Sequence, residues 1–475
     1  MGARLQLVWF RSDLRVYDNA ALVQAMSQGP TLAIFIACPD SWQQHDMAPI
    51  KQDLIRRRAL ALQQELAELQ VPLLLAEGSG YDAVEDIFRA LLPLGIGCVY
   101  SELEYELREQ QRDQQLQAWL AEQGIGWWQC DRQAAFTPGS FVNGSGSMYQ
   151  VFTPFKKRWL QALAEQELTV LPKPKPKPQQ KMELAVPQLP VFQPGNGSSK
   201  DWSVDSEELL QQLRDYCQSR VQLYKKQRDF PALDATSRLS PYLAVGALSV
   251  RQCIRRLQLE AGDAIWQAES GAAVWLSELI WRDFYKHVLV AWPELIKHQP
   301  FQKDTTAIRW RNDETLFAAW CAGQTGYPLV DAAMRQLNQT GWMHNRLRMV
   351  VASFLVKDLH IDWRWGERYF MRQLIDGDFA ANNGGWQWAA STGTDAAPYF
   401  RIFNPITQSE RFDPKGQFIR TWLPELAAVP DAAIHWPHKL TNRNQYPAPV
   451  VDHAKARATT LELFQQARQQ AGEGL

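Results

Sequence analysis

The sequence predicts a parallel α/β domain followed by a mostly α-helical domain, and three observations lead to this prediction. Strand and helix patterns alternate over residues 1–131. A stretch rich in proline and glycine follows at 136–204, and from residue 206 onward the patterns are helical with almost no strand signal. At about 150 residues per domain, a chain of 475 residues has room for two or three domains. We therefore expect an α/β domain at 1–135, a linker at 136–204 and a helical domain at 205–475.

The first domain is predicted from short apolar runs separated by amphipathic segments. The runs are rich in β-branched and aromatic residues, as strands are, and lie at 5–10, 31–38, 71–76, 98–100 and 125–130. Apolar residues at helical spacing lie at 50–70, 82–92 and 106–123. This alternation predicts a parallel sheet covered by helices on both faces. No G-x-G-x-x-G motif follows the first run, so we expect no dinucleotide at that turn.

The linker is predicted from its proline content. Residues 171–181 read LPKPKPKPQQK, which cannot form a helix interior and is expected to be extended and solvated. Binding of nucleic acid by these lysines is the alternative, and we favour the solvated linker. The loop sequence QPGNGSSK follows at 193–200. The whole segment is therefore expected to cross the surface between two domains.

The second domain is predicted from repeated helical patterns. Ser206 is expected to cap a helix at 206–219, with Glu207 and Glu208 in its first turn, where the helix dipole favours carboxylates. Further helical patterns lie at 271–291, 327–339, 345–359 and 365–373. These segments predict a domain built of packed helices.

Tryptophan is the abnormal feature of the composition, with 20 residues of which eleven lie between positions 275 and 422. Helix packing accounts for several of them. Trp386 and Trp388 lie in the glycine-rich segment 382–388, where one ring can pack inward while the other lines a surface cavity. Gly384 and Gly385 would let the backbone approach a flat ligand closely. Aromatic faces beside arginines suit stacked bases and phosphates.

Charge and cysteine content exclude several classes of protein. The net charge of −1 excludes binding of nucleic acid by bulk positive charge. Residues 1–135 hold 11 Lys and Arg against 18 Asp and Glu, and the remainder holds 39 against 33, so a polyanion would bind the second part. The six cysteines are scattered, which predicts neither a metal site nor disulfides and fits a reducing cytoplasm. We find no apolar run of membrane-spanning length and no signal-peptide pattern.

Several short motifs, in order and spacing, make the sequence recognisable. They are WFRSDLR at 9–15 with DN at 18–19, TSRLS at 236–240, WLSELIWR at 275–282, GWMHNRLRM at 341–349, DGD at 376–378 and the run 382–404. Over essentially its whole length the chain closely resembles the cryptochrome/photolyase family, and specifically bacterial class I cyclobutane pyrimidine dimer photolyases of the folate-antenna type. The resemblance implies a Rossmann-like α/β domain, a long linker and an all-helical domain that binds FAD.

The resemblance implies a reduced, non-covalent, U-shaped FAD inside the helical domain. Residues implied to hold its phosphates are Tyr224, Thr236, Ser237, Arg238, Leu239 and Ser240. Residues implied to surround its rings are Trp275, Trp342, Asn345, Arg348, Asp376, Gly377, Asp378 and Asn382. Arg348 and Asp376 are expected to form an ion pair beside the flavin, with an ordinary salt bridge between helices as the alternative. Asn382 would face flavin N5, where an uncharged amide tolerates the reduced anionic ring.

The resemblance also implies a pocket for a pyrimidine dimer that is flipped out of the DNA stack. Trp281 and Trp388 would form an apolar wall against the bases, and Met349 would pack beneath them. Glu278 and Asn345 would hydrogen-bond the polar edges of the bases. A carboxyl in a dry pocket tends to be protonated, so Glu278 could donate to a base carbonyl. Residues implied to contact the phosphates are Arg228, Arg282, Arg346 and Arg401.

The implied reaction is a light-driven carbon–carbon lyase reaction. Excited FADH⁻ passes one electron to the dimer, both cyclobutane bonds split, and the electron returns, so the cofactor supplies the chemistry. Trp386, Trp363 and Trp310 match the family's electron-transfer chain from flavin to surface. His45, Glu109 and Lys297 match contacts of a 5,10-methenyltetrahydrofolate antenna. Arg108 and Ile296 depart from the family pattern there, and a deazaflavin or no antenna is the alternative.

Two other functions compete with this interpretation. A (6-4) photolyase would need two pocket histidines, and the matching positions hold Asn345 and Met349. A cryptochrome photoreceptor without repair activity is the non-enzymatic alternative, and Asn382 and the Trp281/Trp388 pair favour the photolyase over it. A receptor is also expected to carry a signalling tail beyond the helical pattern at 452–470. We expect a cytoplasmic monomer that binds UV-damaged DNA independently of sequence and has no membrane or metal association.

Overall fold

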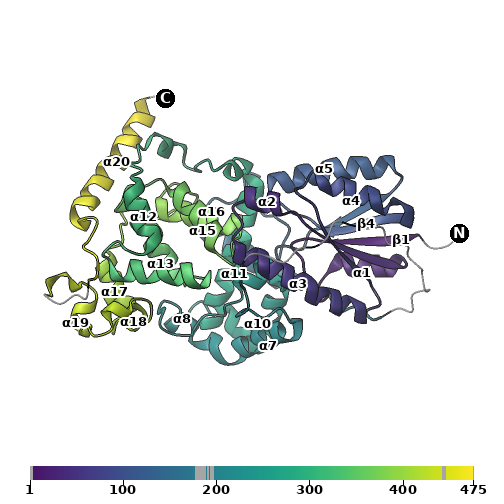
Figure 1. The fold of residues 1–475 in the computed structure, drawn as a ribbon, viewed down its shortest axis with the longest axis horizontal. Helices are drawn as coiled ribbons and strands as arrows, with labels where there is room; N and C mark the ends of the chain where they lie inside the picture. The colour runs from purple at the N-terminus through teal and green to yellow at the C-terminus, as the bar shows by residue number, and fades with distance from the viewer. Residues whose placement is uncertain (1–3, 177–188, 190–191, 193–196, 441–444, 474–475) are drawn as a thin grey trace. The chain divides into compact units, whose positions relative to one another are not determined.

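In the computed structural model, which describes residues 4–176, 189, 192, 197–440 and 445–473, the chain forms two compact units (Figure 1). The first comprises Met1–Tyr149, Thr153–Gln222 and Ser237–Ile296, and the second comprises Gln150–Phe152, Leu223–Thr236 and Lys297–Leu475. The domain boundaries expected from the sequence, at 135 and 204, stay predictions.

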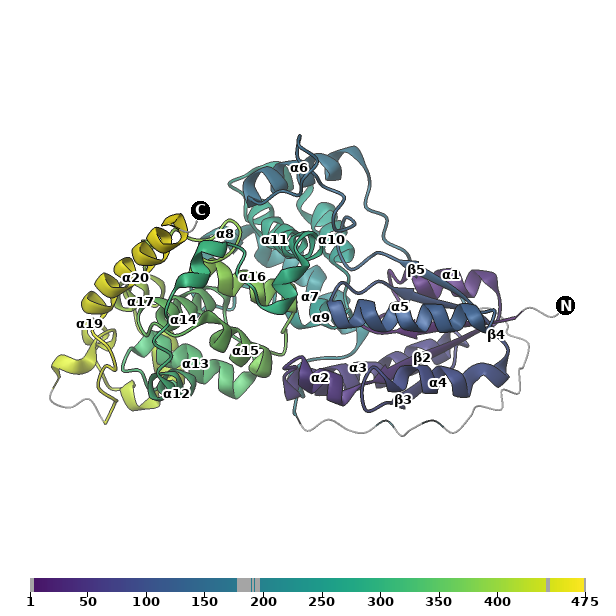
Figure 2. The same cartoon turned by 90° about the horizontal axis from the view of Figure 1, so that it is seen from above.

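A five-stranded parallel sheet forms part of the first unit, with strand order β3-β2-β1-β4-β5. Its strands are β1 (Leu5–Phe10), β2 (Thr31–Ala37), β3 (Leu73–Glu77), β4 (Ile96–Glu102) and β5 (Gly126–Cys130). The helices around it are α1 (Ala20–Gln28), α3 (Pro49–Glu68), α4 (Ala83–Leu91) and α5 (Leu107–Glu122). Figures 1 and 2 show α4 and α5 on one face of the sheet and α1 and α3 on the other. The predicted α/β fold is confirmed.

The central strands form where the sequence is continuously apolar. Every residue of β1 and β2 is buried, as expected for parallel strands covered on both faces. β4 is longer than the predicted strand at 98–100 because its polar end is buried too. Ser101 Oγ accepts a hydrogen bond from Arg11 Nη2 at 3.2 Å, and Arg15 Nη2 donates to Glu102 Oε1 at 2.5 Å. Hydrogen bonds and an ion pair with arginines therefore satisfy the polar side chains that are buried at this end of the strand.

The remaining helices of the first part of the chain are α2 (Pro39–Gln44), α6 (Phe152–Glu165), α7 (Ser206–Asp215), α9 (Ser240–Ala244), α10 (Val250–Ala261) and α11 (Gly271–Ala291). The predicted cap of α7 is wrong by one residue. Asp205, not Ser206, accepts hydrogen bonds from the backbone N–H groups of Glu207 and Glu208. A carboxylate at this position also interacts favourably with the helix dipole. α7 ends at Asp215, where a single π turn, Tyr216–Arg220, follows.

Helix α6 lies within the segment that the sequence predicts as linker, before the stretch 171–181 that is expected to be solvated, and it has a packed face. Its residues Phe155 and Trp159 are fully buried. Trp159 Nε1 donates to Asp283 Oδ2 at 3.0 Å, and the backbone N–H of Ala135 donates to the same oxygen at 3.0 Å. Asp283 lies on α11 and is itself fully buried. This carboxylate therefore attaches α6, and the backbone at Ala135 just before the segment, to α11.

The second unit is helical. Its helices are α8 (Tyr224–Gln227), α12 (Glu314–Ala322), α13 (Pro328–Thr340), α14 (Asn345–Lys357), α15 (Trp363–Gln373), α16 (Phe379–Ala390), α17 (Pro405–Phe412), α18 (Gln417–Trp422), α19 (Asp431–Ile434) and α20 (His453–Glu473). Its core is formed mainly by α13, α14, α15 and α16. α15 begins two residues before the predicted helix at 365–373 because Asp362 caps it, accepting from Arg364 N at 3.0 Å. The helical domain expected from the sequence is confirmed.

Short single-turn 3₁₀ segments connect many of these helices, at Leu92–Leu94, Val221–Leu223, Gly262–Trp266, Pro293–Lys297, Lys303–Ala307, Pro424–Leu426 and Pro437–Lys439. Among the described residues, no helix has both the length and the apolar character needed to cross a membrane.

Candidate functional site

In the second unit, Arg348 on α14 pairs with Asp376, which lies in the turn before α16. Arg348 Nη2 donates to the two carboxylate oxygens at 3.0 and 2.8 Å, and Arg348 Nε donates to the carbonyl of Met343 at 2.9 Å. Asp376 is only 8% exposed, and a carboxylate at this depth needs such a partner. The expected ion pair is therefore present. Its place beside a flavin stays a prediction.

Asn382, on the first turn of α16, has a fixed side-chain orientation. Its Nδ2 donates to the backbone carbonyl of Glu367 at 3.0 Å, while its Oδ1 accepts no hydrogen bond from the described residues. Glu367 on α15 is 1% exposed, and its carboxylate accepts from Asn383 Nδ2 at 2.7 Å. The other carboxylate oxygen lies 2.8 Å from His298 Nδ1, and this hydrogen bond raises the pKa of His298. The Asn382 side chain is thus oriented with its Oδ1 left to accept a hydrogen bond.

Three tryptophans matched to the electron-transfer chain differ in burial. Trp386 on α16 is 2% exposed and Trp363 on α15 is 1% exposed, whereas Trp310 is only partly buried and packs against the same core. The indole N–H of Trp386 is buried and has no hydrogen-bond partner among the described residues. Trp310 is therefore the most exposed of the three rings, and their role in electron transfer stays a prediction.

Helices α15 and α16 approach closely through Gly366. A Cβ at this position would lie 2.1 Å from Cη2 of Trp386 and 2.6 Å from Cδ2 of Leu355. Nothing in the sequence marks Gly366, because a glycine within a helical pattern carries no signal for the ring that covers it.

The glycine-rich segment 382–388 is helical, since it lies inside α16. Gly385 is exposed and no atom lies within 4 Å of its would-be Cβ. Trp386 is buried while Trp388, two residues on, is partly exposed, so the two rings differ in environment as expected. Trp388 remains partly open to a ligand.

The start of α14 carries residues matched to the lesion pocket. Asn345 is exposed and Met349, one turn later, is partly exposed, so both lie on one accessible helix face. His344 caps the helix, its Nδ1 accepting from Arg346 N at 3.2 Å. Burial lowers the pKa of His344 to about 4, so this imidazole is neutral near pH 7. Trp342, also matched to the flavin site, is 9% exposed.

Helix α11, in the first unit, carries residues matched to the flavin site and to the lesion pocket. Trp275 is buried at 4% exposure, with its ring 5.1 Å from that of Tyr216. Glu278 and Trp281 are partly exposed, and Trp281 packs against the rings of Phe284 and Tyr285. Helix α11 therefore presents one carboxyl and one aromatic ring that are both partly exposed.

The residues matched to FAD phosphates are divided between the units. Tyr224 and Thr236 belong to the second unit, and Ser237, Arg238, Leu239 and Ser240 to the first. Arg238 has a left-handed backbone, with φ of 53°. The carbonyl of Ser237 accepts from Gln212 Nε2 at 2.9 Å, which anchors this strip to α7. Gly377 is buried and Asp378 caps α16, accepting from Ala381 N at 3.0 Å.

The four arginines matched to DNA phosphates have different surroundings. Arg401 is exposed, and Arg228 lies over the ring of Tyr224, 5.6 Å from its centroid. Arg282 is 17% exposed and donates to the carbonyl of Gln133 at 2.7 Å, so it already has an intramolecular partner. Arg346 pairs with Asp229 at 2.8 Å.

Two of the three residues matched to the antenna lie together in the first unit. His45 Nδ1 is 3.3 Å from Glu109 Oε1, which also accepts from the hydroxyl of Tyr81 at 2.7 Å. Glu109 Oε2 is buried with no partner among the described residues. Such an orphaned acceptor fits a ligand that donates an N–H group. Lys297 belongs to the second unit. Tyr81 was missed by the sequence analysis.

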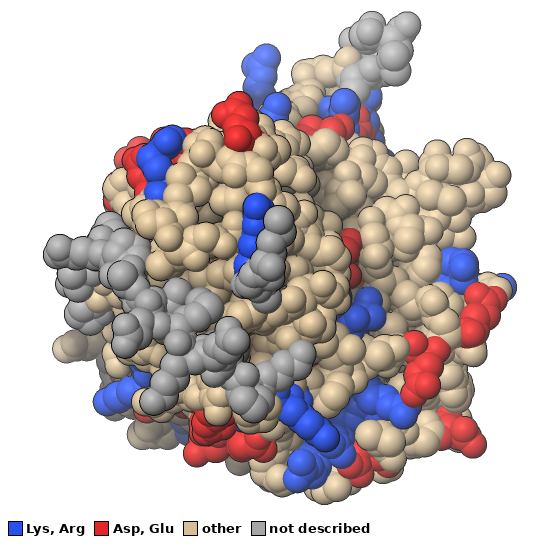
Figure 3. Space-filling model, turned by 90° about the vertical axis from the view of Figure 1, so that its right-hand side faces the viewer, with Lys and Arg blue, Asp and Glu red and all other residues tan. Residues whose placement is uncertain are grey.

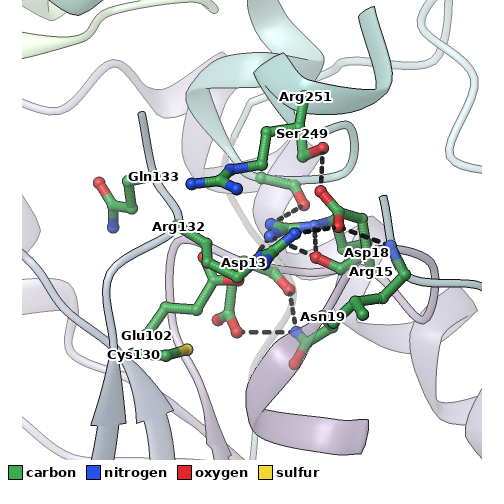
Figure 4. Close-up of polar contacts among 12 residues, drawn as sticks. Asp13, Arg15, Asp18, Asn19, Glu102, Cys130, Arg132, Gln133, Ser249 and Arg251 are labelled. Atoms are coloured by element: carbon green, nitrogen blue, oxygen red, sulfur yellow. Dashed lines mark hydrogen bonds and ion pairs between the residues drawn. The ribbon is translucent and has the colours of Figure 1, made fainter. Parts of the chain in front are cut away.

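A buried network surrounds the motif residues 13–19 (Figure 4). Asp18 is fully buried and accepts from Arg132 Nη2 at 2.7 Å, Ser249 Oγ at 2.6 Å and the backbone N–H of Leu171 at 3.0 Å. Arg15 Nη2 pairs with Glu102 at 2.5 Å, and burial raises the pKa of Glu102 to about 7. These contacts join the sheet to the start of α10, so this motif has a structural role.

Charges on the visible face of the molecule are mixed. Figure 3 shows Lys and Arg side chains interspersed with Asp and Glu. Within the described ranges, no group of three or more His, Cys, Asp or Glu side chains could hold a metal ion.

Known proteins match the chain over nearly its whole length. Residues 6–179 match the model of a family described as DNA photolyase, and residues 275–466 match one described as the FAD binding domain of DNA photolyase. The deoxyribodipyrimidine photo-lyase of Vibrio cholerae is 51% identical over 474 residues, covering 98% of this chain and 100% of that protein. The enzyme of the same name from Escherichia coli is 47% identical over 473 residues, covering 97% and 98%.

Solved structures give the same result for the fold. The crystal structure of a bacterial class III photolyase from Agrobacterium tumefaciens matches with a TM-score of 0.83 and 33% identity. The match covers 99% of this chain and 98% of that one.

Proposed function

Because the chain belongs to the cryptochrome/photolyase family, we propose that it uses light to split cyclobutane pyrimidine dimers in DNA, as a bacterial class I photolyase does. It binds FAD through the helical part that matches the photolyase FAD-binding domain. The alternative, a photoreceptor without repair activity, has less support, because relatives at 47–51% identity are named photo-lyases.

The single structural observation that supports this function best is the orientation of Asn382. Its amide nitrogen is occupied by the carbonyl of Glu367, so its oxygen is available to accept a hydrogen bond. A reduced flavin offers an N–H donor at N5, which fits this oxygen. When bound and reduced, FAD supplies the electron that splits the dimer. On the same helix, the buried indole N–H of Trp386 also has no hydrogen-bond partner among the described residues.

The residues of this chain would bind the flavin, orient it and exclude water from it. Arg348 and Asp376 would set the charge beside the flavin ring, with Trp275 and Trp342 packing around it. Hydroxyl and backbone N–H groups of Tyr224 and of 236–240 would hold the phosphates without much net charge. Trp363 and Trp310 would carry the oxidising equivalent from Trp386 outward.

The lesion would be held by side chains that are only partly buried in this structure. Trp281 and Trp388 would stack against the dimer, and Met349 would contact it from below. Asn345 and Glu278 would hydrogen-bond the base edges. Arg228, Arg346 and Arg401, with Arg282 once released from Gln133, would contact phosphates, which carry no sequence information.

The antenna site would lie around the pair His45 and Glu109. His45, Glu109 and Lys297 would contact 5,10-methenyltetrahydrofolate, and Glu109 Oε2 is the acceptor still in need of a donor. We also expect a monomer that works in the cytoplasm.

The direct test is repair of UV-irradiated oligothymidylate by chemically reduced protein, in blue light and in darkness. Recovery of thymine absorbance only in the light is the expected result. Absence of recovery, with FAD shown to be bound and reduced, would identify the protein as a photoreceptor or as specific for another lesion. Omission of the reductant controls for direct photolysis.

A further inference from the structure

In the second unit, the carboxylate of Asp229 lies between two arginines that the proposed function assigns to DNA phosphates. Its Oδ1 accepts from Arg346 Nη2 at 2.8 Å and from Arg346 Nε at 3.3 Å, and lies 3.7 Å from Arg228 Nε. The Asp229 side chain is 33% exposed, and those of Arg228 and Arg346 are 28% and 16% exposed. All three groups are thus partly exposed to solvent.

Arg346 is held from a second direction as well. Its guanidinium lies 4.4 Å from the ring centroid of Phe412, at the end of α17, and Arg411 lies 5.1 Å from the same centroid. Two bonds to a carboxylate and a stacked ring fix the plane of the guanidinium before DNA arrives. Arginine is suited to this because its fork is planar and rigid.

A carboxylate at this position has opposite effects on two kinds of complex. Intact DNA is bound mainly through its phosphates, in many registers and with release of counterions. There Asp229 repels the backbone, and a fixed arginine gives no advantage. A complex with a flipped dimer has one register, so an arginine that is already ordered loses less side-chain entropy on binding.

We propose that Asp229 is a specificity-determining residue, which weakens binding to intact DNA while it orders Arg346 for the complex with damaged DNA. This inference rests on the proposed function. Asp229 is a positioning residue, because it acts on DNA through Arg346 and through its own charge and contacts no reacting atom.

The test compares Asp229→Asn with the unaltered protein, both with FAD bound, in darkness. Affinities are measured for a duplex with one thymine dimer and for the same duplex without it, over a series of salt concentrations. We expect affinity for the intact duplex to rise about fivefold and its salt dependence to steepen by about one charge. The ratio of the two affinities is expected to fall at least about threefold.

Two further variants separate this role from a general charge effect. Asp431→Asn also removes a carboxylate paired with an arginine, since Asp431 Oδ1 accepts from Arg420 Nη2 at 2.7 Å, and it should leave the ratio unchanged. Asp229→Glu retains the charge and should restore most of the discrimination. An unchanged ratio in Asp229→Asn, or an equal change in Asp431→Asn, would overturn the inference.

Repair in light by the same unaltered preparation tests the proposed function separately. Repair with an unchanged ratio contradicts only the role of Asp229, whereas a protein that neither repairs nor distinguishes the two duplexes contradicts the proposed function. If the Asp229→Asn variant loses its FAD, the Arg346→Lys variant tests the inference instead. This variant keeps the charge but loses the fork, and it should weaken binding to the dimer-bearing duplex more than to the intact one. Equal weakening would overturn the inference.

Discussion

The six-membered ring of Trp386 lies so close to Gly366 that a methyl group at residue 366 would meet its Cη2 atom at 2.1 Å. The contact joins α15 to α16 and fixes the indole that is expected to be first in the electron-transfer chain. The position of this ring therefore depends on a residue with no side chain.

Replacing Trp386 by Phe should block light-driven reduction of oxidised flavin and leave repair by chemically reduced protein intact. Phenylalanine keeps the packing, but its ring is much harder to oxidise than indole. Flavin absorbance during illumination with an external reductant measures the first effect, and dimer repair measures the second. Trp422→Phe, at a partly buried ring against the same core, is the control. Equal photoreduction in both variants would refute the assigned chain.

Gly366→Ala should lower the free energy of unfolding by about 1–3 kcal/mol, because the added methyl overpacks a filled space. Gly385→Ala is the matched variant in the neighbouring helix, since nothing lies within 4 Å of the added atom. It should be stabilising by about 0.5–1 kcal/mol, as alanine is in helix interiors. Denaturant unfolding of both variants after removal of FAD measures both changes, because the backbone at Gly385 is expected to lie close to the ligand. A destabilised Gly385→Ala would contradict the packing argument.

Trp281→Arg should reduce discrimination between damaged and intact DNA about tenfold, because a base stacked on an aromatic ring gains roughly 1–3 kcal/mol. The new positive charge should also strengthen binding to intact DNA. Trp266→Arg, at a ring that is 46% exposed on the 3₁₀ segment after α10, controls for the added charge. Binding to the two duplexes in darkness is the measurement. Unchanged discrimination would show that Trp281 on α11 does not line the lesion pocket.

Glu102→Gln should flatten part of the pH dependence of stability. Burial raises the pKa of Glu102 from 4.5 to about 7, so between these values the folded state holds a proton that the unfolded state has released. Its contribution to stability is therefore largest at low pH and is lost as pH rises through about 7. Unfolding of both proteins in urea, from about pH 5 to about pH 8, measures the difference. Parallel stability curves would show that Glu102 does not titrate there.

Local patterns predicted much of the fold. The strands β1 and β2 are continuously apolar, and α11 has the predicted bounds because a serine cap and an apolar face mark it clearly. Neighbouring cap formers are harder to distinguish, and Asp205 was missed beside Ser206. Helix α6 was missed because the prolines that follow it dominate the composition of the segment.

The site residues that form a sequence motif could be predicted. Those that act through a backbone group, or whose partner lies far away in the sequence, could not. Asn382 and Trp386 follow from the resemblance, but the carbonyl of Glu367 that orients Asn382 leaves no mark in the sequence. Tyr81 and Glu109 are 28 residues apart, and Asp18 and Ser249 are 231 apart, so nothing local relates them. Asp229 is an ordinary loop carboxylate until the fold places it against Arg346.

The hydrogen bonds of Asp18 also set an order of events during synthesis. Two of its donors, the N–H of Leu171 and the hydroxyl of Ser249, leave the ribosome long after the sheet residues have emerged. Until then this carboxylate must stay hydrated, since a buried charge without its partners is costly. The strands can pair early, but the carboxyl end of the sheet near Asp18 cannot be covered before α10 has been made. A fragment that ends at residue 135 should therefore leave this end of the sheet exposed and should self-associate. A fragment that extends past α10 should not.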